Sequence, residues 1–199
     1  MIFLLSPAFC GGKRAQLLLR ERATFPLAQR LRESGGVSIG EVFSFVSGLY
    51  FRGKLAYARQ FARPARGVPG VMVITPTLGI VETETAVSRD HLAEFGTIDI
   101  ARHDARFTTP FERDARRLAS QCGGTVVLLG SVATGKYVDV LVELFGERLL
   151  FPVDFVGRGD MSRGGLMLRS VREKRELNYI PVAGAIRHGP RPPKLARIR

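Results

Sequence analysis

Residues 130–137 combine glycines, hydroxyl groups and a lysine in an order that could bind an anion. They satisfy the phosphate-loop pattern G-x-x-x-x-G-K, but Tyr137 stands where that loop needs the serine or threonine that binds magnesium. We therefore expect a looser anion site, in which backbone N–H groups at a helix N-terminus attract the ligand. The alternative is a tight strand–helix turn with a solvated lysine. The expected contacts are Gly130, Ser131, Thr134, Gly135, Lys136 and Tyr137.

Residues 157–165 hold four glycines, two arginines, an aspartate and a serine between two expected strands. Arginine binds phosphate or carboxylate through paired hydrogen bonds, and a carboxylate can act as a general acid or base. We expect Asp160 to be that acid or base, with Arg163 and Lys136 holding an anion. Further ligand contacts are expected from Arg158, Gly159 and Ser162. The alternative is a solvated glycine-rich loop.

Two further segments with polar side chains follow apolar strands. Ser6 and Lys13 flank the loop after the first strand, and Thr75 and Thr77 follow a later one. Cys10 would be a nucleophile if Lys13 or a helix N-terminus stabilised its thiolate. The alternative is that this cysteine is a small buried apolar residue, as most lone cysteines are.

The elements that must position these loops alternate between strands and helices, which predicts an α/β fold with a mixed central sheet. Apolar runs predict strands over 2–5, 71–75, 125–129 and 149–155. Helical spacing predicts helices over 13–33 in two pieces broken at Pro26, over 40–62 in two pieces hinged near Gly48 or Gly53, and over 88–95, 110–121 and 134–145. Alternation over 166–171 and 176–182 predicts a C-terminal β-hairpin.

Length and composition predict one α/β domain over 1–186, helical at about 13–62, followed by a basic proline-rich tail over 187–199. The apolar N-terminus has no basic region before it, so we expect a strand and not a signal peptide. No uncharged apolar run is long enough for a membrane helix. Two cysteines are too few for a disulfide framework, and the histidines lack metal-ligand spacing. We expect a cytoplasmic protein without metal or cofactor.

The net charge of +12 is concentrated at the two ends of the chain. Residues 1–66 hold 11 basic and 3 acidic side chains, and residues 187–199 hold 5 basic and no acidic ones. This distribution favours a polyanionic partner such as DNA, RNA or a nucleotide-like ligand. An arginine-rich composition is also what a GC-rich coding sequence produces, so the charge alone does not decide the partner.

Several of these segments, in order, resemble the YaaA family of peroxide-stress proteins. The matching motifs are Ser6-Pro7-Ala8, Gly48-Leu49-Tyr50, Thr75 to Ile80, Gly130 to Tyr137 and Arg158 to Arg163. Phe9 departs from the family pattern, because the signature has a lysine there. The resemblance implies a YaaA-type fold, DNA binding and a role in protecting DNA during oxidative stress.

Two functions are therefore expected. The first is a DNA-binding protein that contacts the phosphate backbone through basic side chains, and the contacts would be Arg52, Lys54, Lys136, Arg158 and Arg163. The second is an enzyme that acts on a nucleobase, nucleoside or nucleotide in a pocket built from the loops after the strands, with Tyr50 among its ligand contacts. A third function, an adaptor whose basic tail docks an acidic partner, has less support.

Overall fold

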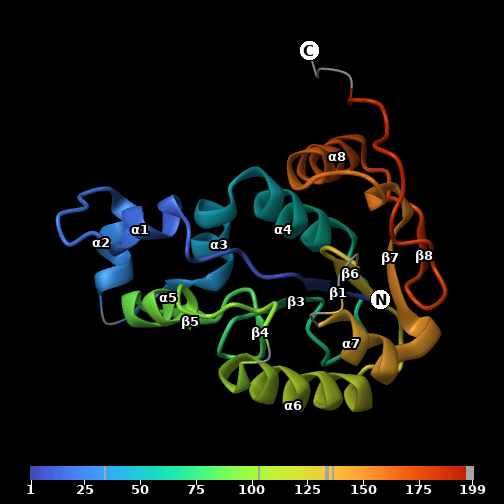
Figure 1. Ribbon diagram of the computed structural model, residues 1–199, viewed down its shortest axis with the longest axis horizontal. Helices are drawn as coiled ribbons and strands as arrows, with labels where there is room; N and C mark the ends of the chain where they lie inside the picture. The colour runs from blue at the N-terminus through green and yellow to red at the C-terminus, as the bar shows by residue number, and fades with distance from the viewer. Residues whose placement is uncertain (34, 103, 133–134, 136, 196–199) are drawn as a thin grey trace.

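The chain forms a six-stranded mixed sheet with helices on both faces, in a computed structural model that describes residues 1–33, 35–102, 104–132, 135 and 137–195 (Figure 1). The strands are β1 (Ile2–Leu5), β3 (Val71–Ile74), β4 (Ile80–Glu82), β6 (Val126–Leu129), β7 (Leu149–Pro152) and β8 (Tyr179–Pro181). Their spatial order is β4-β3-β1-β6-β7-β8. The four central strands run parallel, and the edge strands β4 and β8 are antiparallel to their neighbours. This confirms the predicted mixed α/β fold.

Helices cover the two faces of this sheet in separate layers. One face carries α3 (Ile39–Ser47), α4 (Leu49–Phe61) and α8 (Asp160–Glu173), and the other carries α6 (Ala105–Gln121) and α7 (Val138–Phe145) (Figure 1). β1 shows why both faces are apolar. Phe3 and Leu5 point into one core, and Ile2 and Leu4 point into the other, because side chains alternate along a strand.

The N-terminal helices gather at one end of the molecule (Figure 1). They are α1 (Lys13–Leu19) and α2 (Pro26–Arg32), with α5 (Arg89–Phe95) and a small antiparallel pair of strands, β2 (Val37–Ser38) and β5 (Ala86–Val87), beside them. The predicted break at Pro26 is confirmed, since this proline begins α2. The predicted hinge at Gly48 is also confirmed, because its φ of 60° separates α3 from α4.

The C-terminal region differs from the prediction in one element. An antiparallel C-terminal pair is present, but it consists of β7 and β8. Residues 166–171, predicted as a strand, belong to α8. The buried residues of α8 are Gly164, Met167 and Ser170, a three-residue spacing that puts one helical face against the core. The glycine-rich segment is therefore a loop only as far as Gly159, which is the N-cap of α8.

Other boundaries also shift. The helix predicted from 110 begins at Ala105, because the side chain of Asp104 caps it by accepting a hydrogen bond from the backbone N–H of Arg106 at 3.0 Å. Pro110 therefore lies inside α6. The predicted strand over 149–155 ends at Pro152 and continues as a 3-10 turn, η2 (Val153–Phe155), and another such turn, η1 (Gly146–Arg148), precedes β7. Residues 133, 134 and 136 lie outside the described residues, so the predicted start of the 134–145 helix is not described.

Helices α4 and α8 touch through their backbones. An added Cβ on Gly53 would lie 2.7 Å from the carbonyl oxygen of Gly164, and one on Gly164 would lie 2.8 Å from the carbonyl oxygen of Leu49. Only glycine allows so close an approach at both positions. This contact brings the first turns of α8 near the helix that carries Lys54, close enough for the charges of Asp160 and Arg163 to act on that lysine.

The segment after β8 has no regular secondary structure through Leu195, as the prolines predicted. It passes beside α8 at the C-terminal end of the molecule, far from α1 and α2 (Figure 1). Among the described residues, no helix combines the length and apolar character needed to cross a membrane.

Candidate functional site

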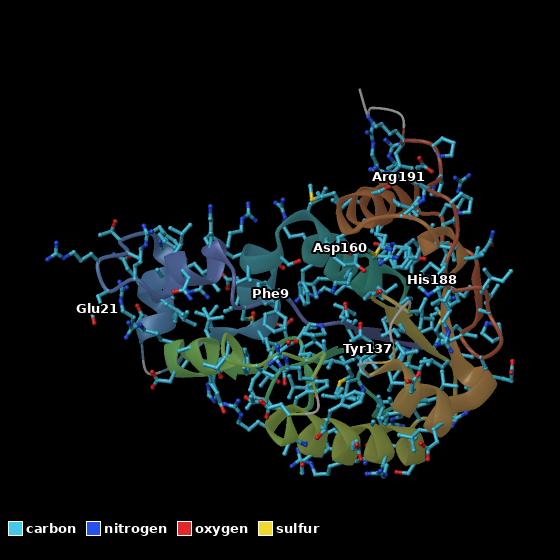
Figure 2. The ribbon with its side chains drawn as sticks, viewed as in Figure 1. Phe9, Glu21, Tyr137, Asp160, His188 and Arg191 are labelled. Atoms are coloured by element: carbon cyan, nitrogen blue, oxygen red, sulfur yellow. The ribbon has the colours of Figure 1, made fainter. Side chains whose placement is uncertain are left out.

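A pocket of about 740 Å³ opens at the carboxyl ends of the central parallel strands. Ser6 follows β1, Pro76 follows β3 and Ser131 follows β6, and all three line it. Other walls come from the segment after α5, from the start of α4 and from the first residues of α7 and α8. Figure 2 shows Phe9, Tyr137 and Asp160 coming from three separate segments around this region. In parallel α/β sheets this edge is where ligand sites form.

A fully buried lysine lies directly behind the pocket wall. The ammonium nitrogen of Lys54 donates to the hydroxyl oxygen of Ser6 at 2.9 Å and to its backbone carbonyl at 2.6 Å. The rings of Tyr50 and Phe51 lie beside it, with their centroids 4.6 and 4.8 Å from the nitrogen. Lys54 has no exposed surface. Ser6 is therefore the member of this pair that meets the pocket.

Burial changes the acid–base properties of Lys54. Desolvation lowers its pKa from 10.5 to about 7, helped by the positive charge of Arg163, while the carboxylate of Asp160 opposes the shift. Near neutral pH a large fraction of Lys54 is then uncharged. An uncharged amine can accept a proton, and its neighbour is the Ser6 hydroxyl.

Two buried phenols lie close to the same serine. A hydrogen bond with Ser6 acts on the pKa of Tyr137, but burial dominates and raises it to about 12. Burial also raises the pKa of Tyr50, while the nearby Arg163 guanidinium opposes the shift, and the buried hydroxyl of Tyr50 donates to no acceptor among the described residues. Both phenols are thus protonated at neutral pH. The hydroxyl of Tyr137 donates to the backbone carbonyl of Ser131 at 3.4 Å.

Gly130 allows the serine and Tyr137 to meet. A Cβ at this position would lie 2.9 Å from both the Ser6 hydroxyl oxygen and the Tyr137 hydroxyl oxygen. The sequence singled out Gly130 as a backbone contact for an anion. In the structure the absence of its side chain is what leaves room for the two hydroxyl groups.

The first turns of α8 supply the charges around this group. Asp160 lines the pocket with a largely exposed carboxylate, and one of its oxygens is 3.7 Å from the guanidinium of Arg163. Arg163 is 11% exposed and donates twice to the backbone carbonyl of Phe155, at 3.0 and 3.2 Å. These bonds hold the arginine in place, so its positive charge acts on the pocket from a fixed position.

The structure brings together many of the residues that the sequence singled out. Those lining the pocket are Ser6, Cys10, Lys13, Tyr50, Ser131, Tyr137 and Asp160. Lys54, Gly130 and Arg163 lie behind its wall. The predicted contacts Thr134 and Lys136 lie outside the described residues.

Other predicted contacts lie elsewhere. Thr75 is buried and its hydroxyl donates to the carbonyl of Gly79, which shapes the turn between β3 and β4. Thr77 donates to the carboxylate of Glu94. Arg52 is exposed on α4. The remaining predicted contacts away from the pocket wall are Gly135, Arg158, Gly159 and Ser162.

The structure argues against a reactive Cys10. Its thiol is buried and donates to the carbonyl of Ala8 at 3.4 Å. Burial raises its pKa to about 12, so the thiolate that a nucleophile needs is scarce at neutral pH. Among the described residues, no group of three or more histidine, cysteine, aspartate or glutamate side chains could hold a metal ion.

Sequence reasoning missed the pairing of Lys54 with Ser6. It placed Lys54 on the surface as a phosphate contact, which is wrong, because the side chain is fully buried. A signal for burial was present. Lys54 follows Tyr50 by four residues and precedes Tyr57 by three, on the apolar face of its helix. Phe9 and Arg14 also line the pocket, and neither was predicted as a contact.

Comparisons with protein-family models, with curated proteins and with solved structures gave no match to this chain. Its function is therefore argued from the site itself.

Proposed function

We propose that this protein is an enzyme that acts on a nucleobase, nucleoside or nucleotide bound in the 740 Å³ pocket. The observation that carries the proposal is the hydrogen bond of 2.9 Å between fully buried Lys54 and the Ser6 hydroxyl at the pocket wall. Burying an amine is costly, because its charged form loses its hydration. A lysine kept at a pKa of about 7 behind a hydroxyl is suited to proton transfer.

Ser6 is the catalytic residue in this proposal, because its hydroxyl meets the pocket. Uncharged Lys54 accepts the hydroxyl proton of Ser6, and the serine oxygen takes a proton from the substrate. The substrate thus loses one proton, Ser6 ends as a hydroxyl again, and Lys54 becomes an ammonium group. Tyr50 donates a hydrogen bond to the negative charge that develops on the substrate. The positive charge of Arg163 stabilises the same charge from behind the wall.

The ligand class follows from the chemistry of the walls. The ring of Phe9 is 77% exposed and lines the pocket, so a planar base can stack on it. Lys13 and Arg14 are exposed at the pocket and can pair with a phosphate or another anion. A volume of 740 Å³ lies in the range of small-molecule sites and is large enough for a nucleotide.

Phosphate-backbone binding, the other function expected from the sequence, loses two of its proposed contacts. Lys54 has no exposed surface and Arg163 is bonded to Phe155. Neither can reach a DNA backbone that lies on the surface. The enzyme proposal uses both residues where they lie.

The test is a ligand screen followed by a turnover assay. Nucleobases, ribonucleosides and 5′-nucleotides would be screened by thermal shift, and mixtures with stabilising compounds would be analysed by mass spectrometry for products. We expect conversion by the wild-type protein, with activity rising through an inflection near pH 7 as Lys54 loses its proton. Ser6→Ala and Lys54→Met are expected to lower turnover by about a hundredfold or more.

Arg52→Ala is the matched control, since Arg52 lies on the same helix as Lys54 but is exposed. It should keep wild-type turnover and the same pH profile. If no compound of these classes binds, or if turnover survives in both Ser6→Ala and Lys54→Met, the proposal is wrong.

A further inference from the structure

A second concave surface, the tail groove, lies on the other side of the first turns of α8. Its volume is about 440 Å³, and its walls are α8 and the segment after β8. Among its lining residues, Arg158, Ser162 and Arg169 come from α8 and the loop before it, and Arg191, Lys194 and Leu195 come from the segment after β8. Asp160 faces the first pocket, whereas its neighbours Met161 and Ser162 line this groove. Figure 2 shows Arg191 beside α8.

Specific contacts hold the tail segment against α8 and the loop before it. Arg158 donates to the carbonyl of Pro193 at 3.4 Å. A Cβ on Gly157 would collide with the carbonyl oxygen of Pro190, and one on Gly165 would lie 3.7 Å from Leu195. The groove is therefore built by two segments that pack closely.

The charge of the groove has one sign. Arg158 and Arg169 contribute from the side of α8, and Arg191 and Lys194 contribute from the tail. No acidic residue is among the lining residues of the described chain. Where the structure describes them, none of these four cations has a carboxylate within ion-pair distance. Elsewhere arginines do pair with carboxylates, as Arg63 does with Glu176 at 2.8 Å.

Arg158 has hydrogen-bonding capacity left over. One of its terminal nitrogens donates to the Ser162 hydroxyl at 3.2 Å, which orients the guanidinium. Its Nε is buried and has no hydrogen-bond partner in the described part of the chain. A buried donor without a partner is costly, and an anion that enters the groove could satisfy it.

We propose that the tail groove binds phosphate groups, supplied either by a nucleic-acid strand or by a free polyphosphate. The lining combines four cations from two segments with the apolar side chains of Leu49, Met161 and Leu168, so phosphates can pair with the cations while the rest of the ligand contacts the apolar side chains. The inference does not depend on the first pocket, whose catalytic group is Ser6.

The probe for this test is a short fluorescein-labelled oligothymidylate, measured by fluorescence anisotropy over a salt series. Arg169→Ala/Lys194→Ala removes one cation from each wall of the groove. Arg172→Ala/Arg22→Ala removes the same number of charges from exposed positions outside it. Thermal melting of all three proteins confirms that they are folded.

We expect the wild-type protein and the control variant to bind alike. The groove variant should bind about tenfold more weakly or worse, with a log–log salt slope about 1.4 smaller in magnitude, since each lost single-strand phosphate contact removes about 0.7. Displacement of the oligonucleotide by inorganic tripolyphosphate would identify free polyphosphate as a sufficient ligand. Failure of tripolyphosphate to displace it would assign the groove to an extended strand. Undetectable oligonucleotide and tripolyphosphate binding, or equal weakening in the two double variants, would overturn the proposal.

Discussion

The two concave surfaces beside α8 differ in one respect: both have exposed cations, Lys13 and Arg14 at the first pocket, but only the first pocket has a fully buried lysine behind its wall. In the first pocket Lys54 is fully buried and Arg163 nearly so, both bonded to backbone carbonyls. In the tail groove Arg191 and Lys194 are exposed. Burial shifts the pKa of an amine and makes it a proton acceptor, whereas an exposed cation keeps its charge and attracts anions in a salt-dependent way. A buried basic side chain is therefore suited to proton transfer, and an exposed one is suited to binding anions.

The largest expected effect tests the cost of burying Lys54. Its pKa is about 7 when folded and 10.5 when unfolded, so the charged form is penalised by on the order of 5 kcal/mol. This penalty is fully present below pH 7 and disappears as the pH rises from about 7 to 10.5. Lys54→Met should therefore raise the free energy of unfolding by about 2 kcal/mol or more near pH 6, after the loss of two hydrogen bonds, and by less near pH 10.

Urea unfolding over a pH series measures this difference. Arg52→Met, a substitution of the exposed neighbour, should leave the pH dependence of stability unchanged. If Lys54→Met raised the free energy of unfolding equally at all pH values, the pKa of Lys54 would not be lowered by folding as we infer.

The next effect tests the close contact between α4 and α8. Gly164→Ala places a methyl group 2.8 Å from the carbonyl of Leu49 and should lower the free energy of unfolding by about 2 kcal/mol. Gly165→Ala is the matched variant, because its methyl group finds only an ordinary contact of 3.7 Å with Leu195. It should stabilise the protein by up to about 1 kcal/mol through helix propensity. Thermal and urea unfolding of both variants would check this, and equal stabilities would contradict the close packing described.

A smaller effect is expected for ligand affinity at Phe9. Once the screen has identified a ligand, Phe9→Ala should weaken its binding by about 1–2 kcal/mol, because a stacked base loses its aromatic partner. Phe9→Tyr should restore most of the affinity. Isothermal titration calorimetry measures both, and Leu17→Ala, a substitution of another exposed apolar residue, serves as control. Unchanged ligand affinity in Phe9→Ala would show that Phe9 does not contact the ligand.

The smallest expected effect is a difference between the two surfaces in how strongly salt weakens ligand binding. A ligand held in the first pocket by one phosphate should show a log–log salt slope no larger than about 1 in magnitude. The tail groove should show a steeper slope, because more cations face the phosphates. Titrations of both ligands over one salt series measure the slopes, and equal slopes would abolish the distinction between the surfaces.

The sequence predicted the elements well where short-range rules act. Pro26 and Gly48 separate helices because one fixes and the other frees the backbone, and these rules need no tertiary information. The strand predicted over 166–171 failed because apolar residues there also fit a helical face, and only packing against α4 decides between them. Short apolar runs carry this ambiguity in general.

The sequence predicted many of the residues of the candidate site, but it did not predict which of them contact one another. Ser6, Tyr137 and Asp160 were singled out because polar residues follow strands. The pairing of Ser6 with Lys54 joins positions 48 residues apart, and no local pattern encodes it. A count of charges also treats every lysine as solvated, so Lys54 was predicted as a phosphate contact although its side chain is buried.

The glycine contact between α4 and α8 has an evolutionary consequence. Because the backbones at Gly53 and Gly164 touch, neither position can accept a larger residue unless the helices separate. Such a separation would also move Asp160 and Arg163, whose charges act on Lys54. Descendants of this sequence should therefore either keep both glycines together with the lysine, or lose all three in concert. These three positions would mark which lineages retain the arrangement on which the proposed activity depends.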